Sequence, residues 1–127
     1  LWCPKIKSFE ALTHTFLGVL KAKKLSPDIL HIHAIGPSLL IPFARKLGLK
    51  TVMTHHGLDY ERAKRGNIAK AVLKYGERLG VSHSDAVIAI SKGIKQHIKD
   101  MFGRDAFLIP NGVNIPTIVP PNEALKN

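Results

Sequence analysis

Short apolar runs alternate with longer stretches of helical periodicity along most of the sequence. Apolar runs of this kind are typical of strands buried on both faces of a parallel sheet. We predict strands over residues 28–33, 50–54, 85–90 and 106–109. The stretches between them space their apolar residues three and four positions apart, which predicts helices over residues 8–24, 38–47, 67–79 and 92–102. This alternation indicates right-handed βαβ units, so the expected fold class is α/β with a parallel sheet of about four strands and flanking helices.

Single residues mark the boundaries of several predicted helices. Ser91 suits the N-cap of the helix that follows it, Pro37 suits the first turn of another, and Gly48 suits a left-handed C-cap. Gly80 and Gly103 end two further predicted helices.

The helix predicted to begin at Asn67 carries two rows of side chains. Its large apolar residues lie at helical spacing, and we expect them to face the core: Ile68, Val72, Tyr75 and Leu79. A basic stripe with four-residue spacing runs along another side of the same helix: Lys70, Lys74 and Arg78.

The formal net charge of +10 raises the question of an acidic partner. Lysine and arginine are spread along the chain, which favours an ordinary solvated surface. Contact with anionic lipid headgroups ranks second, with the basic stripe as its surface. Nucleic acid ranks last, because the few aromatic residues are not interleaved with basic ones and no nucleic-acid-binding motif is present. We therefore predict no nucleic-acid partner.

Length and composition bound the domain organisation. At 127 residues, 45% of them hydrophobic, the chain can form one domain with a modest core. We expect this domain over residues 1–114, and a linker or tail over the proline-containing, aperiodic residues 115–127. No apolar run reaches the roughly twenty residues of a transmembrane helix. The single cysteine, Cys3, excludes an internal disulfide and a multi-cysteine zinc site, and suits a reducing compartment.

Histidines gather where two predicted strands end. His31 and His33 alternate with apolar residues and so share one face of the first strand, while His55, His56 and Gly57 come at the end of the second. Ligands of open α/β sheets bind at the carboxyl ends of the strands, so the site is expected here. Paired histidines can bind a metal, but no carboxylate lies at a metal-ligand spacing. We favour a structural or substrate-contacting role for these histidines.

Other chemical signatures are weak or missing. The backbone N–H groups after Ser91 suit an anion, although ordinary capping is the favoured role. The fingerprints of dinucleotide-binding loops, P-loops and nucleophile elbows do not occur. The residue pattern alone therefore predicts only the ligand-binding half of an α/β protein.

Four short motifs occur in order along the chain, at residues 28–37 (DILHIHAIGP), 54–60 (THHGLDY), 86–91 (AVIAIS) and 109–113 (IPNGV). Together they resemble the N-terminal domain of bacterial family-4-type glycosyltransferases, which are retaining enzymes of the two-domain GT-B fold. The resemblance covers about residues 5–114. It implies a Rossmann-like, partial N-terminal half that shapes the acceptor side. Its first strands would precede Leu1, and a donor-binding domain would follow Asn127.

The same resemblance implies roles for single residues. His56 is expected to be catalytic, close to the donor sugar. The substrate-binding residues would be Gly57, Asp59, Arg62, Lys64, His33, Ser91, Asn111 and Gly112. The chain departs from the family pattern at two places, since it has Lys64-Arg65-Gly66 where the family often has Lys-Trp-Gly, and Asn114 where aspartate is common.

The activity implied is transfer of a sugar from a nucleotide-sugar donor to a glycan or lipid-linked acceptor, without a metal or other cofactor. We expect this chain alone to be inactive, cytoplasmic or peripheral at the inner face of the membrane, and prone to self-association through an exposed sheet edge. The alternative is a non-enzymatic module that binds a sugar or phosphate.

Overall fold

The computed structural model describes residues 10–58, 61 and 66–112, and these form an α/β unit. Four strands make one sheet: β1 (Leu30–His33), β2 (Thr51–His55), β3 (Ala86–Ala89) and β4 (Phe107–Leu108). The helices are α1 (Glu10–Leu25), the 3-10 turn η1 (Pro37–Leu40), α2 (Ile41–Lys46), α4 (Asn67–His83) and α5 (Lys92–Phe102). The predicted fold class is thereby confirmed, and the predicted tail, residues 115–127, lies outside the described residues.

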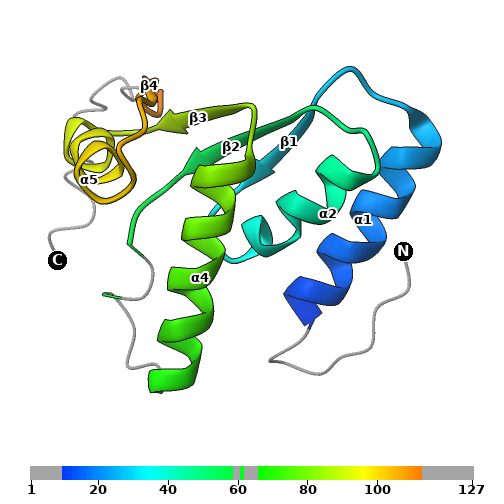
Figure 1. The fold of residues 1–127 in the computed structure, drawn as a ribbon, viewed down its shortest axis with the longest axis horizontal. Helices are drawn as coiled ribbons and strands as arrows, with labels where there is room; N and C mark the ends of the chain where they lie inside the picture. Colours follow the sequence, from blue (N-terminus) through cyan, green and yellow to red (C-terminus); the bar gives the residue numbers. More distant parts are fainter. Residues whose placement is uncertain (1–9, 59–60, 62–65, 113–127) are drawn as a thin grey trace, which may run out of the picture.

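The sheet is parallel throughout, in the order β1-β2-β3-β4. Each strand is added on the same side of the previous one, so right-handed crossovers place the connecting helices on one face. Figure 1 shows α1, α2 and α4 in front of the strands. Ile32, Met53 and Val87 are paired across neighbouring strands and point into the core that these helices cover. The opposite face carries His31 and His33, which are exposed within the described part of the chain.

Helix α4 packs on the sheet through small residues, and this corrects the prediction of its buried face. A Cβ on Gly80 would lie 2.6 Å from Met53 Sδ and 2.6 Å from Ser38 Cβ, and one on Gly76 would lie 2.4 Å from Ile35 O. The helix therefore approaches β2 and η1 more closely than any larger side chain allows. Most of the row expected in the core faces outward, with Ile68, Val72 and Tyr75 all exposed and Leu79 half-buried. Gly80 also does not end the helix, which continues to His83.

The stretch predicted as one helix over residues 38–47 is divided in two. Pro37 begins η1 as expected, and α2 starts at Ile41. Pro42 has no backbone N–H and so cannot bond to the carbonyl of Ser38, which interrupts the helical ladder at this point. The predicted glycine cap is confirmed, since Gly48 has φ +81° just after α2.

Candidate functional site

Most of the predicted site residues lie at one edge of the sheet. His33 is the last residue of β1, and His56 and Gly57 directly follow β2. Ser91 follows β3, and Asn111 and Gly112 follow β4. Because the strands are parallel, their carboxyl ends meet at this edge. The predicted residues Asp59, Arg62 and Lys64 lie outside the described residues.

Three histidines form a cluster on the exposed face of the sheet at this edge. His33 Nδ1 lies 3.1 Å from His56 Nε2, and the ring of His33 is centred 4.2 Å from that of His31 and 5.4 Å from that of His56. The strand register explains the cluster, because His33 pairs with Thr54 and His56 continues the same face two residues later. His31 Nε2 is anchored to Thr54 Oγ1 at 2.7 Å. We refer to His31, His33 and His56 as the histidine cluster.

The neighbouring rings of the cluster affect the protonation of His31. Partial burial, and then the proximity of His33 and His56, lower the pKa of His31 from its usual 6.5. A hydrogen bond between the rings of His33 and His56 needs one nitrogen to donate and the other to accept. A bonded pair of this kind presents ring nitrogens that suit the hydroxyl groups of a sugar.

His55 is fully buried and is therefore separated from the cluster. Its Nε2 lies 2.8 Å from Glu77 Oε1 on α4, and the same oxygen lies 2.8 Å from His97 Nε2 on α5. The backbone N–H of Gly57 donates to the other ring nitrogen, Nδ1 of His55, at 3.2 Å. His55 and His56 thus point to opposite faces of the sheet, and His55 has a structural role.

Sequence reasoning did not identify Glu77 and His97. They lie 22 and 20 positions from their partners His55 and Glu77, so no local motif connects them. The available signal was the position of Glu77 on the row of Leu73, Gly80 and Val81, which are buried on α4. A carboxylate on a buried helix row requires a partner in the core.

Ser91 and Gly57 contribute to the local geometry of the edge. Ser91 Oγ accepts a hydrogen bond from the N–H of Ile94 at 3.2 Å, which confirms the predicted cap of α5. Gly57 has φ +142°, a conformation that side-chain-bearing residues rarely adopt. The turn after β2 therefore depends on a glycine directly beside His56.

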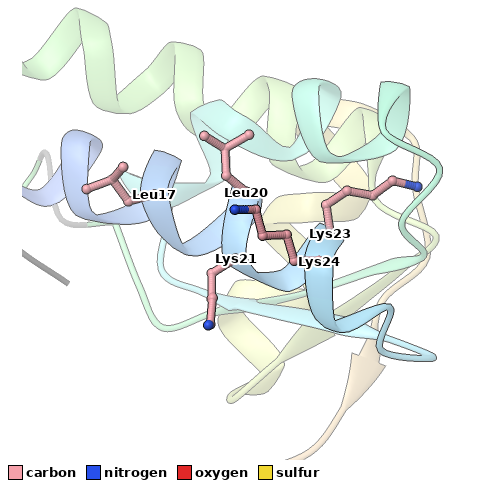
Figure 2. Close-up of a pocket in the computed structure, with 5 residues that line it drawn as sticks. All are labelled: Leu17, Leu20, Lys21, Lys23 and Lys24. Atoms are coloured by element: carbon pink, nitrogen blue, oxygen red, sulfur yellow. The ribbon is translucent and has the colours of Figure 1, made fainter.

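An open hollow lies elsewhere, along α1. Figure 2 shows its lining, which comes entirely from that helix: Leu17, Leu20, Lys21, Lys23 and Lys24. Among the described residues, no predicted site residue, carboxylate or imidazole lines this hollow. We therefore assign the candidate site to the carboxyl edge of the sheet.

The described residues show neither a metal-binding cluster nor a membrane-spanning helix. Over residues 10–58, 61 and 66–112, no group of three or more His, Cys, Asp or Glu side chains is arranged to hold a metal ion. Within the same residues, no helix is long and apolar enough to cross a membrane. The expected metal-free chemistry and the cytoplasmic location stay predictions.

Comparison with known proteins connects this geometry to a family. Residues 6–116 match the sequence profile of Glycosyltransferase Family 4. The chain is also 26% identical over 117 residues to an uncharacterized glycosyltransferase of Methanocaldococcus jannaschii. That alignment covers 87% of this chain and 32% of the relative, so the chain spans about a third of the relative's length.

Proposed function

The chain belongs to Glycosyltransferase Family 4, and from this membership we propose that it forms the acceptor side of a retaining GT-B glycosyltransferase. The whole protein would transfer a sugar from a nucleotide-sugar donor to a glycan or lipid-linked acceptor. A donor-binding part would complete the site, and the 32% coverage of the relative supports this part of the proposal.

Within the structure, the observation that supports the proposal is the bonded pair of His33 and His56 at the carboxyl edge of the sheet. His33 is exposed and His56 is half-buried, so a sugar can reach both rings. Loss of the nucleotide leaves positive charge on the sugar ring and negative charge on the departing phosphate. We assign to His56 a hydrogen bond to the donor sugar, and to His33 the orientation of the His56 ring through their 3.1 Å contact.

The remaining predicted residues are proposed to bind substrate. Gly57, Ser91, Asn111 and Gly112 are supported by their positions at the same edge, and Asp59, Arg62 and Lys64 by the family resemblance alone. Backbone N–H groups and basic side chains would stabilise the leaving phosphate, so the reaction is proposed to need no metal or other cofactor.

We also propose peripheral contact with an anionic membrane, through the outer face of α4. This face combines the exposed Ile68 and Tyr75 with the exposed Lys74 and Arg78. The one carboxylate of α4, Glu77, is buried, so the charge on this helix that faces outward is basic. Apolar and basic residues on one exposed helix face suit the boundary between acyl chains and anionic headgroups. A lipid-linked acceptor would be reached from such a surface.

The transferase proposal is tested on the full-length protein with a panel of nucleotide sugars, with donor hydrolysis and transfer as readouts. We expect His56→Ala to lower kcat/KM by at least about tenfold, because one hydrogen bond to the reacting sugar is lost. His83→Ala is the matched control, since His83 is exposed at the far end of α4. Sugar binding without transfer or hydrolysis would instead support the non-enzymatic module.

A further inference from the structure

A chain of hydrogen bonds runs from the interior to the turn that carries His56. It begins at His97 on α5, passes through Glu77 on α4 to His55 at the end of β2, and ends at the backbone N–H of Gly57. His55 and Glu77 are 0% and 3% exposed, respectively. Three separate elements of the fold thus meet at two buried side chains directly behind the site.

The backbone N–H of Gly57 fixes which atoms donate and which accept along the part of this chain that joins Gly57, His55 and Glu77. A backbone N–H can only donate, so Nδ1 of His55 must accept from Gly57 and carries no proton. The ring proton of His55 therefore resides on Nε2 and is donated to Glu77 Oε1 at 2.8 Å. If His55 were protonated at Nδ1, that N–H would point at the N–H of Gly57. Two donors cannot bond to each other, so the contact with Gly57 would be lost.

His56 lies between the two residues that this chain of bonds holds. On one side is the buried ring of His55, and on the other is Gly57, whose amide is bound and whose φ is +142°. The main chain on both sides of His56 is fixed in this way, and with it the direction in which the His56 ring projects toward His33.

We propose that Glu77 is a positioning residue of the site, which through His55 holds the Gly57 turn and thereby directs His56. This inference rests on the proposed function. Glu77 touches no substrate in this scheme, and its effect on transfer passes entirely through His56. The contact with His97 keeps the Glu77 carboxylate in place, since both rings bind the same oxygen.

The structural half of the proposal is tested on the 127-residue chain by nitrogen-15 NMR of the histidine rings. We expect the wild-type His55 ring to carry its proton on Nε2. Glu77→Gln retains an acceptor for this proton and should preserve both the tautomer and the Gly57 amide signal. Glu77→Leu has a similar volume without an acceptor, and should shift the Gly57 and His56 signals. A proton on Nδ1 of wild-type His55, or unchanged Gly57 and His56 signals in Glu77→Leu, would overturn the proposal.

The functional half is tested by transfer kinetics of the full-length protein. Glu77→Leu is expected to lower kcat/KM by roughly tenfold to a hundredfold, the cost of misplacing a reacting group by about an ångström, while Glu77→Gln restores most of the rate. In a His56→Ala background, Glu77→Leu should have no further effect, because the residue that it positions is gone. An equal loss in both backgrounds would show that Glu77 acts only on general stability, and would refute the positioning role.

The test remains decisive if Glu77→Leu does not fold or if the full-length protein is inactive. If Glu77→Leu does not fold, His55→Leu removes the acceptor for the Gly57 amide and should reproduce the loss of rate, again only when His56 is present. If the wild-type full-length protein transfers no sugar, the proposed function fails, while the NMR measurement still decides whether Glu77 controls the Gly57 turn. Asp105→Asn, at an exposed carboxylate paired with Lys99, is the control for removal of a charge.

Discussion

At the scale of single residues, His31 couples the site to pH. Burial and the neighbouring rings of His33 and His56 lower its pKa below the usual 6.5. The unfolded chain therefore binds a proton at this position more readily than the folded protein does. The contribution of His31 to stability is complete above about pH 6.5 and is lost as the pH falls through the lowered pKa.

We expect the free energy of unfolding to decrease between about pH 7.5 and about pH 5.5, and to decrease less in His31→Gln. Glutamine can still contact Thr54 but has no proton to gain. Urea denaturation at several pH values provides the measurement, with His83→Gln as the control at an exposed histidine. An identical pH dependence of wild type and His31→Gln would contradict the prediction.

The residues of the site differ in how far the sequence could reveal them. The position of His33 and His56 at the carboxyl edge was predictable, because each lies at the end of a predicted parallel strand, whereas the role expected for His56 came from the family resemblance. Glu77 was not, since its role depends on α4 turning its glycine-containing row toward β2. The row of a helix that faces the core depends on which side chains let the helix backbone pack closely against its neighbours. Ser91 was predictable as a cap because capping is local.

At the scale of elements, the strands could be located from their apolar runs, whereas the buried face of α4 could not. Ile68, Val72 and Tyr75 form the more regular apolar row, yet α4 packs through Gly76 and Gly80. A row of large side chains would hold the helix away from the sheet. The sequence pattern shows which residues are hydrophobic. Which face of α4 is buried, however, is decided by side-chain volume.

Gly80→Ala therefore tests the packing of α4 directly. Alanine is the better helix former, but its Cβ would meet Met53 and Ser38 at 2.6 Å, so we expect a net destabilisation of about 1–3 kcal/mol. Gly93→Ala on α5 is the matched control, because its Cβ would meet only Ser91 Oγ at 3.9 Å. That variant should be stabilised by roughly 0.5–1 kcal/mol. Chemical denaturation of both variants measures the difference, and a stabilised Gly80→Ala would disprove the close-packing argument.

The outer face of α4 predicts binding to anionic vesicles. Tyr75 is 58% exposed beside basic residues, so Tyr75→Glu removes an apolar contact and adds a repelled charge. We expect it to weaken co-sedimentation with anionic vesicles severalfold, and salt to weaken the wild type in the same assay. Met101→Glu makes a similar change at an exposed residue of α5 and should have little effect. Equal binding to neutral vesicles would count against the membrane proposal.

At the scale of the whole molecule, the sheet has an open edge at β1 within the described part of the chain. Leu30 donates its N–H to Lys50 and Ala34 donates to Thr54, so the backbone of the intervening residues His31 and His33 faces away from β2. Strand order places no described strand on that side. Such an edge is a template for pairing with another chain.

We therefore predict that the 127-residue chain self-associates as its concentration rises. Lysine blunts strand edges, so Ile29→Lys, at an exposed position just before β1, should shift the equilibrium toward monomer. Leu25→Lys is the control, because it removes a comparably exposed apolar side chain at the end of α1 without altering the edge. Light scattering over a concentration series distinguishes the two causes. If both variants reduce association equally, general surface hydrophobicity is responsible, and if the wild type stays monomeric throughout, the β1 edge does not pair with a second copy.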